Sequence, residues 1–224
     1  MRCTHTESKC DTKYEDPITK RIIDRIKYSI VKIKFNKDIN SIGFFMKMKV
    51  NNKEMKCLFI CNHLISNNDI KNKIIINIIY DKKGKEEEIN IRLDENLRFI
   101  KNFNNNENIT LIEIIKNDGI PEDKYLEPDL NYDDEFNKYK NLNIYLASYP
   151  GNSNVNEKSI SLGRVTKVLD NKFEYILDNN VGSFGSPICN NNCQVIGIYT
   201  SKNKNENINY GTFIGKIIDT LNNK

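Results

Sequence analysis

The stretch Gly182-Ser183-Phe184-Gly185-Ser186-Pro187 decides the fold of this chain. It follows an alternating, strand-like run at residues 173–178, and it precedes two further strand-like runs within residues 187–198. Glycine adopts positive φ without steric cost, so the two glycines predict a tight turn between strands. A turn of this kind is also typical of an ordinary loop. Its meaning therefore depends on what the rest of the chain places beside it.

A hairpin in the first third of the chain ends on a histidine. Residues 42–50 and 55–65 alternate as strands, and Asn51-Asn52-Lys53 forms the turn between them. The whole sequence has only two histidines, His5 near the start and His63 at the end of this hairpin. Any imidazole-dependent chemistry therefore rests on His63. Taken by itself, the motif is also typical of a half-buried histidine that caps a strand.

Two further segments complete the pattern. A strand-like run at residues 109–115 is preceded by Asn108, and the turn Tyr149-Pro150-Gly151 ends another strand-like run. Between them, residues 117–140 are acidic and contain prolines, as expected of a linker between two halves. The chain closes with a short helical pattern at residues 217–221.

Together, these segments resemble the trypsin-like (chymotrypsin-fold) serine peptidases, in the same order along the chain. The quoted stretch is similar to the family's Gly-Ser-Ser-Gly-Ser-Pro signature, and the His63 hairpin is similar to the one that carries the family's catalytic histidine. The strand after Asn108 resembles Asp-Ile-Thr-Leu-Ile-Glu-Ile, and Tyr149-Pro150-Gly151 resembles Gly-Tyr-Pro-Gly. The resemblance implies an all-β fold of two six-stranded antiparallel β-barrels, with short N- and C-terminal helices. It predicts a disordered polar tail at 1–20, a first barrel at 21–117, an acidic inter-barrel linker at 118–140, and a second barrel with the C-terminal helix at 141–224.

The resemblance also assigns the three positions of a catalytic triad, and two of them carry the wrong residue. His63 stands where the family has its general base, Asn108 where it has the orienting aspartate, and Phe184 where it has the nucleophilic serine. Phenylalanine has no lone pair to attack a carbonyl, and asparagine tends to hold the imidazole in the wrong tautomer. The backbone N–H groups of Gly182 and Phe184 would still form the oxyanion hole. We therefore expect a catalytically inactive homologue that binds a peptide or protein in the inter-barrel cleft.

An enzyme is the alternative interpretation. Ser183 and Ser186 are the hydroxyls nearest to position 184, and either could serve with His63 in an active intracellular serine endopeptidase, although each is displaced along the loop. Glu107 is the only carboxylate beside Asn108, and strand alternation points its side chain the opposite way. A third interpretation is a β-barrel unrelated to peptidases, in which the triad positions would not converge.

The position of Phe184 at the tip of this turn predicts where its ring lies. Leaving the ring in water would forgo the burial of about 150 Å² or more of apolar surface. We therefore expect Phe184 to plug the specificity-pocket side of the cleft or to lie across His63. Contact with an apolar ring disfavours the imidazolium, so we expect the pKa of His63 to lie at or below its ordinary value.

Composition argues against several other classes of protein. Lys and Arg number 34, Asp and Glu 30, and the net charge of +4 is spread over the loops, which argues against nucleic-acid binding. No apolar run approaches the roughly 20 residues that span a bilayer, and the first residues do not resemble a signal peptide. We therefore expect a cytoplasmic monomer that binds no membrane and uses no cofactor.

The six cysteines predict free thiols, because nothing at the start of the chain indicates secretion. Cys57 and Cys61 lie on one strand and are interpreted as packing residues. Cys189 and Cys193 flank a turn of three asparagines, where a cross-strand disulfide is geometrically possible. The loose Cys-x-His-x4-Cys pattern at residues 3–10 lacks the spacing and the fourth ligand that zinc requires, so no metal is expected.

Overall fold

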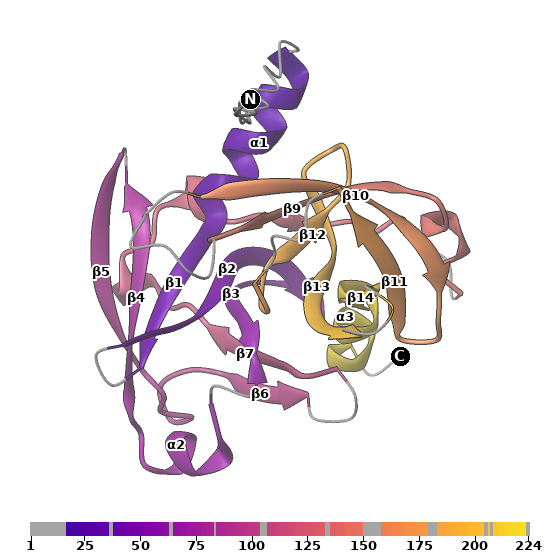
Figure 1. The fold of residues 1–224 in the computed structure, drawn as a ribbon. Coiled ribbons are helices and arrows are strands. Elements are labelled where there is room, and N and C mark those ends of the chain that lie inside the picture. Colours follow the sequence, from indigo (N-terminus) through magenta and orange to yellow (C-terminus); the bar gives the residue numbers. More distant parts are fainter. Residues whose placement is uncertain are drawn as a thin grey trace, which may run out of the picture.

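The computed structural model describes residues 17–35, 38–62, 65–82, 84–103, 107–132, 135–149, 158–178, 183–203, 206 and 208–222. This part of the chain forms two β-sheets and three α-helices, α1 (Pro17–Ser29), α2 (Asn67–Lys71) and α3 (Ile214–Leu221) (Figure 1). The strands of the first half are β1 (Ile30–Phe35), β2 (Asp38–Val50), β3 (Lys53–Cys61), β4 (Ile75–Lys82), β5 (Lys85–Arg92), β6 (Ile100–Phe103) and β7 (Ile109–Glu113). The connection to the second half contains the short 3-10 helices η2 (Lys116–Asp118), η3 (Glu122–Lys124) and η4 (Asn137–Tyr139), and the short strand β8 (Glu127–Pro128). The strands of the second half are β9 (Asn143–Ser148), β10 (Ser159–Val168), β11 (Lys172–Leu177), β12 (Pro187–Cys189), β13 (Gln194–Asn203) and β14 (Ile208–Phe213).

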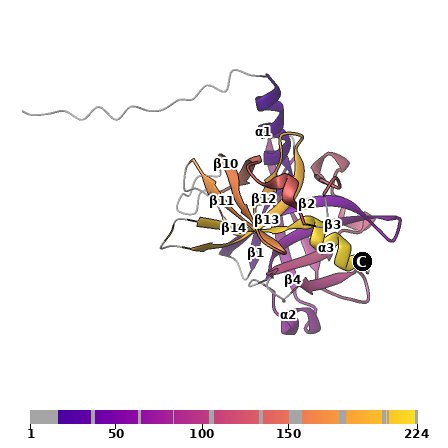
Figure 2. The same cartoon turned by 90° about the vertical axis from the view of Figure 1, so that its right-hand side faces the viewer.

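Helix α1 opens the described chain and corresponds to the short N-terminal helix that the resemblance implied. It begins at Pro17, a residue whose fixed φ suits the first turn of a helix. Ile22, Ile23 and Ile26 share one face, and all three are buried. The two side views show α1 at the opposite end of the molecule from α2 (Figures 1 and 2). The predicted tail therefore gives way to a helix at residue 17, and residues 1–16 lie outside the described residues. No helix in the described ranges is both long and apolar enough to cross a membrane.

The second half forms a closed six-stranded barrel, as the sequence predicted. Its hydrogen-bonded order is β12-β9-β10-β11-β14-β13, and β13 returns to β12 and closes the circle. The interior is aromatic, and the rings of Phe173 and Phe213 lie with their centroids 4.7 Å apart. The loop that contains Phe184 connects β11 to β12, so this barrel is the scaffold that carries it.

The first half is not a closed six-stranded barrel, which corrects the prediction. It is a seven-stranded sheet of order β5-β4-β1-β2-β3-β7-β6, and in the described residues its edge strands β5 and β6 are not paired with each other. The physical reason lies between these two strands, where the carbonyl of Asp94 accepts the N–H groups of Leu97 (2.9 Å) and Arg98 (3.1 Å). The chain turns there, and a buried ion pair between Arg98 and Asp118 (2.8 Å) fixes the turn against the connection that follows β7.

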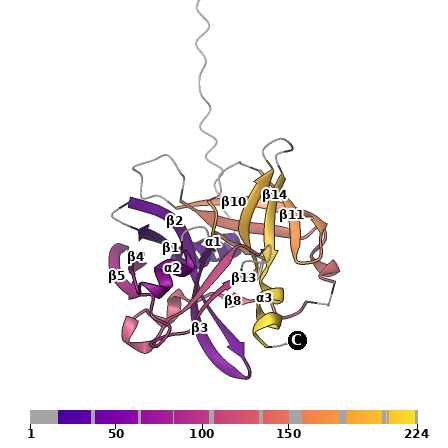
Figure 3. The same ribbon diagram turned by 90° about the horizontal axis from the view of Figure 1, so that it is seen from below.

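One hydrophobic core belongs to both sheets. From the first half it includes Phe44 and Phe59, whose stacked rings have centroids 5.4 Å apart. From the second half it includes Val195 and Ile198 of β13, and helices α1 and α3 also contribute to it. Seen from below, the two halves lie side by side with β13 and α3 between them (Figure 3). The seam between the halves is therefore packed.

Candidate active-site region

The turn Ser183–Ser186 is fixed by backbone contacts on two sides. The N–H of Gly185 donates to the carbonyl of Tyr199 (2.9 Å), and the N–H of Tyr199 donates to the carbonyl of Ser186 (3.0 Å). Gly185 has φ +91°, and a Cβ there would lie 2.1 Å from the carbonyl oxygen of Ile42. Only glycine fits this position, because both the backbone conformation and the approach of β2 exclude a side chain. The second glycine of the quoted stretch thus docks the turn onto the first half of the molecule.

Asn108 meets the same seam from the first half. It precedes β7 with φ 56°, a left-handed conformation that asparagine tolerates better than most residues. Its carbonyl accepts the N–H of Asn62 (3.1 Å), the residue that follows β3. The Gly185 turn contacts β3 one residue earlier, since a Cβ on Gly185 would lie 3.6 Å from the backbone nitrogen of Cys61. The Phe184 turn and Asn108 therefore converge on the end of β3, whereas His63 and Gly182 lie outside the described residues.

Phe184 is only partly buried at the tip of the turn. The side chain is 43% exposed. Its ring leans on the ring of Tyr199, with centroids 5.0 Å apart and planes tilted by 48°. Tyr199 is itself buried, and it supports one face of Phe184. The tip of the turn therefore carries a partly exposed aromatic ring. Contact between Phe184 and His63 cannot be placed, because His63 lies outside the described residues.

The two alternative nucleophiles have different surroundings. Ser183 donates its hydroxyl to the carbonyl of Tyr149 (2.8 Å). Ser186 is fully buried, and its hydroxyl has no hydrogen-bond partner among the described residues. A substrate carbonyl could reach Ser186 only after the turn had moved. Glu107 also turns to other partners, because its carboxylate accepts a hydrogen bond from Asn171 (3.4 Å).

Cys57 and Cys61 are buried, as the interpretation of them as packing residues requires. The thiol of Cys61 donates to the carbonyl of Tyr199 (3.5 Å). Burial raises the pKa of Cys61 to about 12, so the thiolate is scarce at neutral pH. Cys189 and Cys193 are free thiols as well, so the disulfide that the sequence left open is not formed.

Sequence reasoning missed Tyr199, which contacts the turn, Cys61 and Phe184. Its backbone clamps the turn, its carbonyl accepts the Cys61 thiol, and its ring carries Phe184. The available signal was its place at the end of the run Gln194–Ile198, the strand that pairs with the segment after the turn. That signal indicates a strand, and it does not indicate which ring lies under Phe184.

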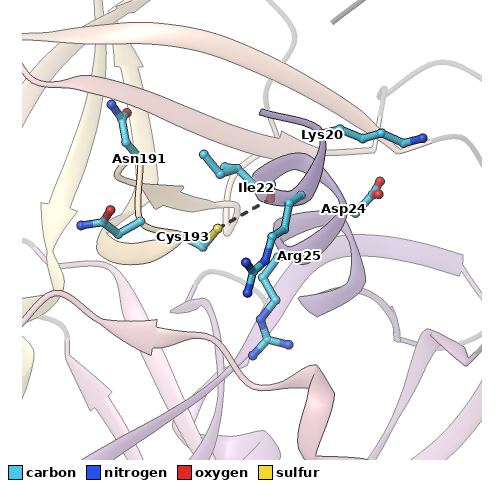
Figure 4. A pocket seen from close by; sticks show the side chains of 8 residues that line it. Lys20, Ile22, Asp24, Arg25, Asn191 and Cys193 are labelled. Atoms are coloured by element: carbon cyan, nitrogen blue, oxygen red, sulfur yellow. Dashed lines mark hydrogen bonds between the residues drawn. The ribbon is translucent and has the colours of Figure 1, made fainter. Parts of the chain in front are cut away.

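A cleft of about 770 Å³ lies elsewhere, between α1 and the turn that joins β12 to β13 (Figure 4). Its cationic residues Lys20, Arg21 and Arg25 face a single acidic residue, Asp24. The Cys193 thiol lies 4.0 Å from the carbonyl of Ile22 and joins the two walls. None of the predicted site residues lines this cleft.

Comparisons with known proteins identify the fold. No protein-family model matches the chain, and no curated protein matches its sequence. Among solved structures, Deg5 matches with a TM-score of 0.63 and 13% identity, over 93% of this chain and 94% of that chain. The active form of the Rv3671c protease from M. tuberculosis matches with a TM-score of 0.61 and 12% identity, over 92% and 86%. A serine protease of a human pathogenic astrovirus matches with a TM-score of 0.54 and 15% identity, over 84% and 90%. The chain thus has the chymotrypsin fold of the trypsin-like serine proteases.

Proposed function

We propose that this chain is a trypsin-like serine peptidase homologue that binds a peptide or protein segment and does not hydrolyse it. The observation that carries the proposal is Phe184. In the proposed assignment it stands at the nucleophile position, on a turn whose backbone is hydrogen-bonded to Tyr199, and its partly exposed side chain has no nucleophilic atom. An exposed aromatic ring on a fixed turn is a good anchor for a partner.

The serines beside Phe184 support the same proposal. The Ser183 hydroxyl donates to a backbone carbonyl, and Ser186 is buried inside the docked turn. Asn108 supports it further, because an amide at the orienting position stabilises an imidazolium less well than a carboxylate does. The degenerate triad then consists of His63, Asn108 and Phe184, and the N–H groups of Gly182 and Phe184 would receive a carbonyl or carboxylate of the bound segment.

The decisive experiment measures hydrolysis in the unmodified protein. We expect no labelling by a fluorophosphonate probe, and no turnover of peptide or ester substrates above the rate of a His63→Ala variant. Labelling that maps to Ser183 or Ser186 and disappears on replacement of that serine by alanine would establish the active endopeptidase instead.

Binding is tested with peptides selected from a displayed library against the unmodified protein. Phe184→Asp should weaken the selected peptides about tenfold or more, because truncation of an aromatic anchor at an interface typically costs over 1 kcal/mol. Phe99→Asp is the matched control, since Phe99 is also exposed (39%) but lies in the first half, just before β6. Equal losses in both variants would remove Phe184 from the binding site.

A further inference from the structure

Three lysines converge where α1, the β4–β5 hairpin and the start of β10 come together. Lys32 on β1 and Lys124 on η3 are almost completely buried, with exposures of 4% and 2%, and Lys158 immediately before β10 is partly buried. Lys32 is neutralised by an ion pair with Glu86 (2.8 Å). A buried ammonium group requires an anionic partner, or it loses its proton and becomes a neutral amine.

Lys158 has a hydrogen bond, but it has no ion pair with any residue that the structure describes. Its Nζ donates to the carbonyl of Lys27 (2.7 Å), and in the described part of the chain no carboxylate forms a salt bridge with it. Its Nζ lies 5.8 Å from the centroid of the Tyr149 ring, and the Nζ of Lys32 lies 4.8 Å from the same centroid. Two like charges on one ring repel each other. A neutral amine keeps the bond to Lys27 and avoids the repulsion.

The protonation equilibrium agrees with this geometry. Burial is the main cause that lowers the pKa of Lys158 to about 8, and the ammonium groups of Lys124 and Lys32 lower it further, against the opposing effect of Asp81 and Glu86. An unperturbed lysine with a pKa of about 10.4 is less than 1% neutral at pH 8. Lys158 is therefore an unusually available nucleophile.

The amine borders a cavity of about 270 Å³, lined by Asp81, Gly84, Glu86, Tyr149 and Lys158. Burial raises the pKa of Tyr149, so its phenol stays protonated and can donate a hydrogen bond. The carboxylates of Asp81 and Glu86 stabilise a cationic product. A nucleophile, a hydrogen-bond donor and a counter-charge thus line one small space.

We propose that Lys158 forms a reversible imine with a small uncharged aldehyde in this cavity. The Nζ lone pair attacks the carbonyl carbon and forms a C–N bond, which gives a carbinolamine after transfer of one proton from nitrogen to oxygen. Loss of the hydroxyl with a second proton from nitrogen releases one water and leaves a C=N bond, which is protonated to an iminium near Asp81 and Glu86. The cavity volume admits an aldehyde of a few carbons, and the carboxylates disfavour an anionic one.

The test uses propanal with sodium cyanoborohydride at pH 7, which converts each imine into a stable propyl-amine. Peptide mass mapping of the protein, labelled in its folded state, should show Lys158 alkylated at least about tenfold faster than the exposed Lys49 and Lys101 of the same molecules. With glyoxylate, an anionic aldehyde, Lys158 should react at nearly the same rate as Lys49 and Lys101. Alkylation of all three lysines by propanal at equal rates would overturn the proposal.

Two controls separate the site from general reactivity. Repeating the reaction in denaturing urea should abolish the preference for Lys158, and a preference that persists there would show that the pocket is not its cause. Lys158→Arg should remove the mapped product while Lys49 and Lys101 react as before. Neither result depends on hydrolysis or on peptide binding. The imine proposal is therefore tested independently of the proposed function.

Discussion

Among single residues, Phe184 and Asn108 are the two that the proposed triad assignment makes responsible for the absence of acyl transfer. Phe184→Ser should restore little or no peptidase activity, because Asn108 still fails to orient the histidine, a defect that costs about 10⁴ in kcat in a serine protease. Phe184→Ser combined with Asn108→Asp should give measurable hydrolysis of an activated ester. Both variants are compared with the unmodified protein in the same assay.

Asn108→Asp alone is the matched control for the double variant, since it restores the orienting group without a nucleophile. It should be as inactive as the unmodified protein. Robust hydrolysis by the single Phe184→Ser variant would contradict the assignment of Asn108 to the orienting position, and an inactive double variant would argue that the turn places residue 184 wrongly.

Lys158 makes a second prediction at this scale, on stability. The pKa of Lys158 in the folded protein is about 8, below its ordinary value, so the unfolded chain binds more protons between about pH 8 and 10.4. The contribution of Lys158 to the stability should therefore become less unfavourable as the pH rises through that window. Lys158→Gln lacks this dependence, so it should be more stable than the unmodified protein at pH 7, by about 1–3 kcal/mol, and the difference should vanish above pH 10.5. Urea unfolding at pH 7, 9 and 10.5 checks this, and a pH-independent difference would contradict it.

At the scale of the element, the turn after β11 depends on a single glycine. Gly185→Ala would force a Cβ to within 2.1 Å of the Ile42 carbonyl in addition to straining a φ of +91°. Gly84→Ala is the matched control, because Gly84 has a similar φ of +82° but nothing within 4 Å of the added Cβ. We expect Gly84→Ala to cost about 1 kcal/mol and Gly185→Ala about 2–4 kcal/mol in unfolding free energy. Equal costs would show that the turn is not docked on β2.

The sequence predicted most elements correctly because their signals are local. The His63 hairpin and the strand after Asn108 follow from alternation, and β2–β3 and β7 confirm them. One feature depended on contacts that the alternation of the sequence does not contain. The turn at Asp94 leaves the first sheet open, and it is stabilised by an ion pair between Arg98 and the distant Asp118.

The local parts of the candidate site were predictable from the sequence, and its tertiary contacts were not. The glycine frame predicted the turn, and the structure brings it together with Asn108 at the end of β3. The sequence did not indicate that the ring of Tyr199 would lie against Phe184. Which side chain lies there depends on the register of β13 against β12, a tertiary property.

At the scale of the whole molecule, the two halves share one core, and we expect them to unfold together. Phe44 and Phe59 from the first half pack in the same cluster as Val195 and Ile198 from the second. A cluster built from both halves cannot persist when one of them unfolds. Thermal unfolding should therefore show a single transition whose calorimetric and van't Hoff enthalpies agree.

The Ile198→Ala variant tests this cooperativity by hydrogen exchange in one strand of each half. Ile198 is fully buried in the shared core, so its truncation should lower the unfolding free energy by about 2–5 kcal/mol. If the halves unfold together, hydrogen exchange of the slowest amides should accelerate by the same factor in β3 of the first half and in β11 of the second.

Ile78→Ala is the matched control, because Ile78 is also fully buried but belongs to a cluster made of first-half residues and their connection. It should accelerate both strands as well, since one cooperative unit transmits a loss from either side. Acceleration confined to β11 in the first variant and to β3 in the second would show two independent units joined by a linker, and the packed seam would then contribute little to the stability of either.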